Sequence, residues 1–166
     1  MRRMYSENQL QEQVKNQLAE GKVNNVKVFE NIVDKDGHKR FIEGVIAVNE
    51  ITGVSIPFAK WALSGTHLLI VLAGTIADTT DLSSGTKIFN DISIPDWVRD
   101  KIVNINANRV AYINQYFYAD DDTNQNATLT LNKRSDNKID LIFYSSITFT
   151  KDRAFRTQID LLIDNA

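Results

Sequence analysis

The most apolar stretch of the chain is residues 61–76, WALSGTHLLIVLAGTI, where a turn at residues 64–66 separates an aromatic-bearing segment from a continuous apolar run. Along residues 68–76 both alternating sets of side chains are apolar. This pattern is typical of a strand that is covered on two faces rather than of a strand that faces water. We therefore predict that this run is a central strand of the hydrophobic core.

The last strand shows the clearest alternation of apolar and polar positions. Its inward set is Phe155, Thr157, Ile159, Leu161 and Ile163, and its outward set is largely charged or amide-bearing. Turns rich in Asp, Asn, Ser and Lys separate it from the preceding strands, and no alternating helices support a parallel sheet. The sequence therefore predicts a mainly β fold, an antiparallel β-sandwich or jelly-roll head.

Between these two strands the pattern predicts several shorter elements. Further strands are expected at residues 86–94, 110–118, 127–131, 139–144 and 147–150. Residues 95–101 begin with Pro95 and are expected to form one helical turn, which Trp97 anchors in the core. In the strand at 110–118, alternation places Val110, Tyr112, Tyr116 and Tyr118 on one face.

The N-terminal 22 residues carry a helical pattern. Ser6 is suited to cap a helix over residues 5–20, and Gly21 is suited to end it. An apolar stripe recurs every four residues at Leu10, Val14 and Leu18. A helix of this length is marginal alone, so the stripe is expected either to pack on its own domain or to form an oligomerisation contact between subunits.

Residues 23–60 are predicted to form a β-hairpin neck. Two β-branched runs, at residues 26–33 and 39–48, flank the turn sequence DKDG at residues 34–37. We expect three parts: the helix over 1–22, this neck over 23–60 and a β-sandwich head over 61–166.

Composition excludes several classes of function. Lys and Arg number 19 against 21 Asp and Glu, a net charge of −2, so we expect no nucleic-acid partner. The longest apolar run is far shorter than a membrane span, so no membrane contact is expected. The chain has no cysteine, which excludes disulfides and thiolate metal sites.

No motif for catalysis, metal binding or a cofactor is present, so we predict no catalytic residues, no metal site and no cofactor. His38 lies in the hairpin turn and His67 begins the apolar run, and both are interpreted as structural or surface residues. The acidic segment at 119–126 resembles a cation loop only superficially, because an EF-hand begun at Asp120 needs Gly and Glu where this chain has Gln125 and Leu131. We interpret this segment as a solvated hairpin tip.

The same tip and the adjacent tyrosines are the candidate ligand site. Aromatic faces beside polar groups commonly hold sugar rings, although core packing and subunit contact explain these tyrosines equally well. The candidate saccharide contacts are Tyr116, Tyr118, Asp120, Asp122 and Asn124.

Three stretches carry a resemblance to a known family. They are LLIVLAGTIADTTDLSSGTKIFNDISIPDW, VAYINQYFYADDDTNQNATLTLN and IDLIFYSSITFTKDRAFRTQIDLLID, and the resemblance extends over roughly residues 61–166. Their order resembles the head domains of the receptor-binding and fibre proteins of phages that infect Gram-positive bacteria. In those heads an apolar strand, a glycine, a loop and an I-P-x-W/F turn precede successive meander strands.

This resemblance implies a non-enzymatic virion protein that is assembled in the bacterial cytoplasm. It implies a homotrimer, attachment to other virion proteins through the N-terminal part, and recognition of host cell-surface saccharide by the head. The stem is shorter than in the tail fibres, so a head fibre, a neck appendage or a prophage-encoded accessory protein is equally compatible. A structural decoration protein without saccharide binding is the alternative, and a polysaccharide hydrolase is the third reading. The family supplies no motif that transfers binding residues to this chain.

Overall fold

The computed structural model describes residues 32–48 and 51–163 of the chain. The predicted N-terminal helix, with Leu10, Val14 and Leu18, lies outside the described residues, as do residues 26–31 of the predicted hairpin. The chain divides into two compact units, Met1–Ile42 and Glu43–Ala166.

In the first unit, the described residues form the turn that the DKDG sequence predicts. Gly37 N donates to Asp34 O at 3.0 Å, and Asp34 N donates to His38 O at 2.9 Å. Gly37 has a positive φ of 82°, a conformation that a residue without Cβ adopts at little cost. One isolated antiparallel bridge joins Val33 to Lys39.

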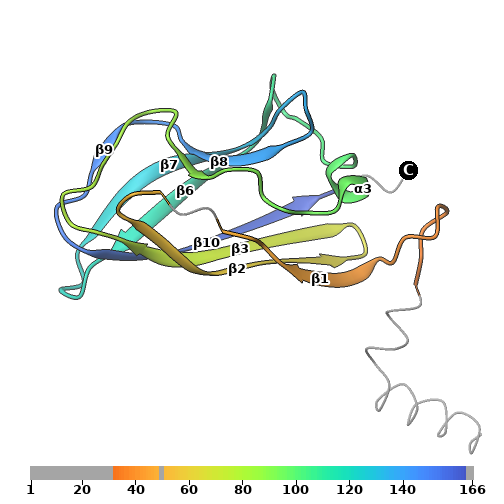
Figure 1. Cartoon of the computed structure of the whole chain (residues 1–166), viewed down its shortest axis with the longest axis horizontal. Coiled ribbons are helices and arrows are strands. Elements are labelled where there is room, and N and C mark those ends of the chain that lie inside the picture. The colour runs from red at the N-terminus through yellow and green to blue at the C-terminus, as the bar shows by residue number, and fades with distance from the viewer. Residues whose placement is uncertain (1–31, 49–50, 164–166) are drawn as a thin grey trace, which may run out of the picture. The chain divides into compact units, whose positions relative to one another are not determined.

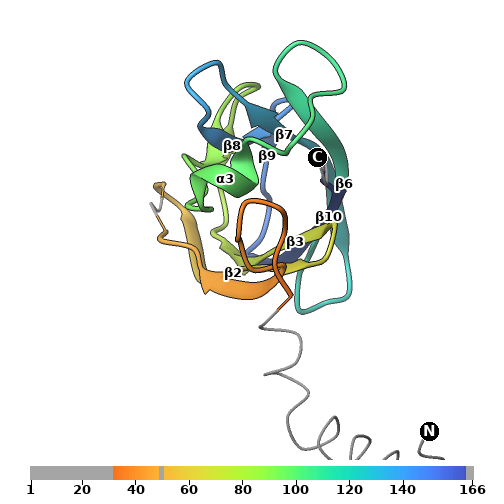
Figure 2. The ribbon, with the colours of Figure 1, turned by 90° about the vertical axis from the view of Figure 1, so that its right-hand side faces the viewer.

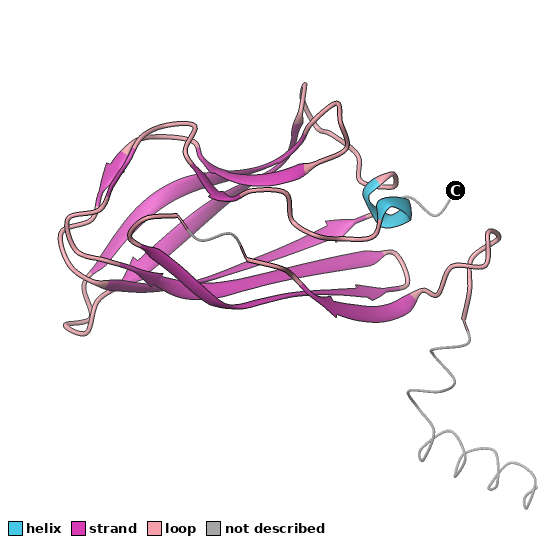
Figure 3. Ribbon diagram, in the orientation of Figure 1, coloured by secondary structure: helices cyan, strands magenta, loops and turns pink. Residues whose placement is uncertain are grey.

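The second unit is built almost entirely from antiparallel strands, as predicted (Figure 3). The strands are β1 (Phe41–Val45), β2 (Val54–Ser64), β3 (His67–Ile76), β4 (Asp81–Leu82), β5 (Lys87–Phe89), β6 (Arg109–Tyr118), β7 (Asn124–Lys133), β8 (Ile139–Phe143), β9 (Ile147–Thr148) and β10 (Arg153–Leu162), and the helical turn is α3 (Asp96–Arg99). Among the described residues, no helix is long and apolar enough to span a membrane.

One eight-stranded sheet, in the order β1-β2-β3-β10-β6-β7-β8-β5, folds back on itself to make two layers. Figure 1 shows β2, β3 and β10 in the lower layer and β6, β7 and β8 in the upper layer. The view in Figure 2 shows the sheet curling between the layers at β10 and β6. A second, two-stranded sheet pairs β4 with β9.

The core lies between the two layers and includes a cluster of four phenylalanines. Phe117 of β6 packs edge-on against Phe149 at 4.9 Å between centroids and lies 5.4 Å from Phe155 of β10. Phe143 of β8 stacks on Phe117 at 6.3 Å. All four rings are buried, so the cluster ties both layers together and each ring contributes a large apolar area.

The apolar run from residue 68 forms β3, which lies between β2 and β10 in the sheet. Leu68, Ile70 and Leu72 are fully buried on the core face, and Val71 on the other face is 8% exposed. The prediction of a core strand with apolar side chains on both faces is therefore confirmed, with the outer face only partly covered.

The predicted boundary between neck and head does not follow the sheet. It falls after residue 60, inside β2, which pairs with β3 from Val54 to Ser64. The compact unit begins at Glu43. The apolar alternation of β2 matches that of β3 across this hairpin, so residues 54–60 pack in the same core as the head.

Two details of the region before β6 correct the sequence prediction. The strand expected over 86–94 is only three residues long, Lys87–Phe89, although Ile92 and Ile94 are buried as expected. The helical turn forms where Pro95 predicts it, but Trp97 is half-buried and Val98 is the fully buried anchor. In this four-residue helix only Val98 is fully buried, so Val98 rather than Trp97 anchors the turn in the core.

Candidate functional site

The candidate site lies where the two layers meet, between β6 and β10. Each of these strands has a complete partner on its other side, β7 for β6 and β3 for β10. Toward each other they pair only at Ala154 and Tyr118. Beyond that pair no further backbone register joins them among the described residues, so the sheet is open along this line.

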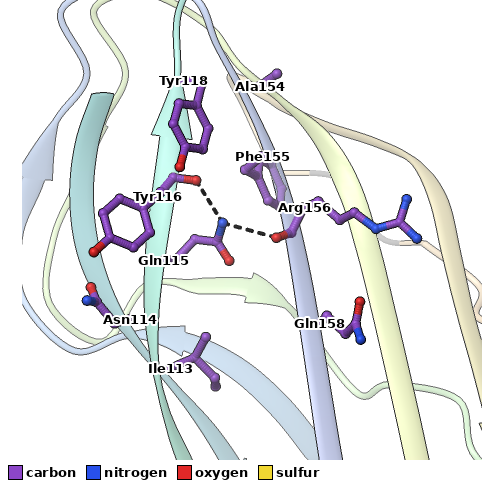
Figure 4. Close-up of a pocket in the computed structure, with 9 residues that line it drawn as sticks. All are labelled: Ile113, Asn114, Gln115, Tyr116, Tyr118, Ala154, Phe155, Arg156 and Gln158. Atoms are coloured by element: carbon purple, nitrogen blue, oxygen red, sulfur yellow. Dashed lines mark hydrogen bonds between the residues drawn. The ribbon is translucent and has the colours of Figure 1, made fainter. Parts of the chain in front are cut away.

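The Gln115 side chain takes the place of the missing ladder. If the register from Ala154 and Tyr118 continued, Gln115 would lie opposite Thr157. Instead, its amide nitrogen donates to Tyr116 O at 2.8 Å and to Arg156 O at 3.2 Å (Figure 4). The Thr157 hydroxyl donates to Gln115 Oε1 at 2.7 Å. Gln115 is 5% exposed, so its amide is buried and fully used.

A groove of about 520 Å³ runs along this opening. It is lined by Ile113, Asn114, Gln115, Tyr116, Tyr118, Ala154, Phe155, Arg156 and Gln158. The lining combines aromatic and aliphatic carbon with three side-chain amides and one guanidinium. Neither Asp, Glu nor His is among these nine residues, so a pair of carboxylates for glycoside hydrolysis is not part of the groove.

Two predicted contact residues, Tyr116 and Tyr118, line the groove. They stand two positions apart on the outer face of β6, 40% and 52% exposed. Their rings stack with centroids 6.2 Å apart and an interplanar angle of 24°. Exposed parallel rings beside amides form a surface suited to a flat, hydroxyl-bearing ligand.

The other three predicted contacts do not line the groove. Asp120 and Asp122 are exposed in the turn between β6 and β7, and Asp122 holds a positive φ of 60°. Asn124 lies opposite Tyr118 on β7, on the side of β6 away from β10. The structure therefore brings Asn124 beside Tyr118 but leaves both carboxylates at the tip.

Several hydrogen bonds stabilise the tip. The Lys151 ammonium group donates to the Asp121 carboxylate, and Thr123 N and Oγ1 donate to Asp121 Oδ1 at 3.1 and 2.5 Å. The Lys151 hydrogen bond, followed by those from Thr123, holds the pKa of Asp121 far below its usual range. Buried Arg153 donates to Thr123 O at 3.0 Å and to Phe117 O at 3.2 Å.

The prediction that Val110 shares a face with the tyrosines is wrong. A register shift between Arg109 and Ala111 interrupts the pairing of β6 with β7. Val110 is consequently buried, while Tyr112 is 46% exposed with Tyr116 and Tyr118. A β-bulge changes the face on which the following residues lie, and simple alternation cannot reveal it.

Tyr112 belongs to a separate aromatic cluster on the same strand. Its ring meets that of Tyr144 edge-on at 5.7 Å, and the Arg109 guanidinium lies 5.5 and 5.2 Å from the two ring centroids. Arg109 also donates to the Tyr112 hydroxyl at 2.8 Å. The ring and hydroxyl of Tyr112 therefore both have partners within the chain, whereas Tyr116 and Tyr118 face the groove.

The sequence analysis missed Arg156 and Phe58. Arg156 lies opposite Ala73 of β3, and Ala73 lies opposite Phe58 of β2. The small Ala73 side chain lets the Arg156 guanidinium reach across β3 to within 5.8 Å of the Phe58 ring centroid. The outward position of Arg156 was evident from alternation, but its neighbour two strands away was not.

In the first unit, Asp34, Asp36 and His38 present possible metal-ligand atoms within 4.8 Å of one another. Asp34 Oδ1 accepts the backbone N–H groups of Asp36 and His38, both at 2.9 Å. Desolvation opposes ionisation of Asp34, but these two donors, together with the electrostatic attraction of Arg40 and His38, outweigh it and lower the pKa of Asp34. This is the geometry of a side-chain-capped turn, which accounts for the grouping.

The chain has few matches among known proteins. No family model matches the chain, and no curated protein matches it. Among solved structures, it is similar to the bovine atadenovirus type 4 fibre head protein, with a TM-score of 0.39 and 15% sequence identity, over 70% of this chain and 97% of that one. The overlap is too loose for the properties of that protein to be transferred to this chain.

Proposed function

We propose that this protein is a non-enzymatic virion fibre or receptor-binding protein whose β-sandwich head binds cell-surface saccharide in the groove between β6 and β10. The observation that carries the proposal is the pair of exposed, stacked rings of Tyr116 and Tyr118 beside the amides of Asn114 and Gln158. Aromatic faces pack against the carbon face of a pyranose ring, and amides both donate to and accept from its hydroxyl groups.

The groove suits recognition better than catalysis. It is open to solvent, and its lining holds no carboxylate to act as acid, base or nucleophile. An open site of this kind gives modest affinity for a single saccharide. In the homotrimer that we propose, three such sites on one fibre raise the overall avidity. The N-terminal part then attaches the head to other virion proteins.

A glycan array followed by isothermal titration calorimetry tests the saccharide function. Tyr116→Ala removes one of the stacked rings and should weaken binding about five- to ten-fold. Tyr112→Ala is the matched control, because Tyr112 is similarly exposed on the same strand but lies outside the groove lining. Equal losses in the two variants would place the ligand elsewhere.

The same preparation distinguishes the alternatives. Light scattering should give the mass of a trimer, and a monomer would contradict the fibre assignment. A trimer that binds no glycan on the array would favour a structural decoration protein. Release of reducing sugar from a bound polysaccharide would favour a hydrolase.

A further inference from the structure

Arg156 is the only charged residue among the nine that line the groove. Within the described part of the chain its guanidinium forms no ion pair, and its one aromatic contact is with Phe58. The Arg156 backbone carbonyl is bound by Gln115, so the backbone at this position is fixed while the side-chain N–H donors stay open to a ligand.

Arg156 belongs to the β10 wall of the groove, across from the tyrosines of β6. Figure 4 shows the Arg156 side chain running away from Tyr116 and Tyr118, across β10 in the direction of β3. Its contact with the Phe58 ring, 5.8 Å from the centroid, restrains its position through a cation–π interaction. The β6 side of the groove is therefore aromatic and neutral, and the cationic group lies on the β10 side.

The surrounding charges preserve this difference. Lys60 Nζ lies 5.6 Å from the same Phe58 centroid and adds positive charge on that side. Asp160, further along β10, is paired with His67 at 3.2 Å. Beyond Tyr118, in the turn that follows β6, the exposed Asp120 and Asp122 disfavour an anion. These charges therefore direct a negative group away from the turn after β6 and toward Arg156.

We propose that the groove contains two subsites and selects an acidic saccharide, with a neutral sugar ring on Tyr116 and Tyr118 and the carboxylate of an adjoining uronic-type sugar on Arg156. This inference rests on the saccharide function proposed above. The planar guanidinium fork matches the two coplanar oxygens of a carboxylate. A single guanidinium suits one negative charge, and the amides of Asn114 and Gln158 are left for hydroxyl groups.

The test uses an array that holds neutral, uronic-acid-bearing and phosphate-bearing oligosaccharides, including hyaluronan tetrasaccharide and its carboxyl-reduced neutral form. Glycans that bind the full chain are then measured by calorimetry with Arg156→Gln and with Lys60→Gln. Lys60 is the matched control, because it contacts the same ring and carries the same charge but does not line the groove.

We expect binding of carboxylate-bearing glycans, about ten-fold weaker in Arg156→Gln and changed less than two-fold in Lys60→Gln. Affinity should also fall with added salt, as it does for an exposed charge pair. Carboxyl reduction of any glycan that binds should reproduce the loss seen in Arg156→Gln.

Each of three other outcomes would refute a different part of the proposal. Neutral glycans that bind wild type and Arg156→Gln equally, and Tyr116→Ala more weakly, would refute the acidic subsite and leave the saccharide function standing. Binding restricted to phosphate-bearing glycans would refute the assignment of a carboxylate. Absence of binding to every class on the array would refute the saccharide function itself.

Discussion

Replacing Gln115 by Met tests whether this side chain holds the two layers together at the groove. Met has nearly the same length and is unbranched, so the change removes the amide with little change in volume. Three hydrogen bonds are lost: those donated to Tyr116 O and Arg156 O, and the one accepted from Thr157.

The structure sets the size of the effect. A hydrogen bond contributes about 0.5–1.5 kcal/mol net, and a buried polar group left without a partner costs about 1–3 kcal/mol. Thr157 is 0% exposed, so its hydroxyl cannot turn to water when the Gln115 amide is gone. We expect the free energy of unfolding to fall by about 2–4 kcal/mol, with the midpoint of thermal unfolding roughly 5–10 °C lower.

Urea unfolding followed by circular dichroism measures this change by linear extrapolation. Gln158→Met is the matched control, because Gln158 lines the same groove but is exposed and makes no hydrogen bond within the described part of the chain. Its effect should lie within about 0.5 kcal/mol of wild type.

A double-mutant cycle with Thr157→Val isolates the buried pair. Val has the shape of Thr without the hydroxyl, so the double variant leaves neither partner of that bond unsatisfied. Gln115→Met and Thr157→Val together should cost at least about 1 kcal/mol less than the sum of the single changes. Additive costs, or a Gln115→Met variant as stable as Gln158→Met, would refute this role for Gln115.

Three further predictions follow from other contacts. Gly74→Ala places a Cβ within 1.9 Å of Ser55 O, a backbone atom that cannot move aside easily, so a loss of at least about 2 kcal/mol is expected in urea unfolding. Asp140 is buried and paired with Lys87 at 2.9 Å and with Arg134 at 3.3 Å, so Asp140→Ala should lower the free energy of unfolding by about 3 kcal/mol. Asp136→Ala is the control, because it removes an exposed partner of the same Arg134 and should lower the free energy of unfolding by less than about 1 kcal/mol. Because the pKa of Asp121 is lowered in the folded state, the stability that its carboxylate contributes is present above about pH 4 and is lost as pH falls toward the folded pKa. The difference in melting temperature between wild type and Asp121→Asn should therefore hold from pH 7 to about pH 4 and shrink below it. A constant difference down to pH 2 would contradict the lowered pKa of Asp121.

The mainly β fold could be predicted from the sequence, because apolar and polar residues alternate at consecutive positions of each strand. In β10, Phe155, Thr157 and Ile159 are buried while the residues between them are exposed, as the pattern requires. The positions of the turns could also be predicted, because the DKDG sequence and Pro95 restrict the backbone locally. These properties depend on neighbours within a few positions of each other.

The groove could be predicted only in part, because it arises from contacts between distant segments. Tyr116 and Tyr118 were identified from their crowding on one strand. Arg156 and Phe58 are brought together by the order β2-β3-β10 and by the small size of Ala73, and no local pattern encodes either fact. Asp120 and Asp122 were selected for their composition, and the register of the β6–β7 hairpin leaves them at the tip.

The groove and the weak point of the sheet have the same origin. If β6 and β10 paired along their full length, their outer faces would form a continuous pleated surface with no opening beside Tyr116. The pairing ends after Ala154 and Tyr118, and the Gln115 amide satisfies the backbone carbonyls left on both sides. These side-chain hydrogen bonds keep the buried backbone carbonyls bonded where the strands separate, so the opening costs less stability than an edge with unsatisfied carbonyls would.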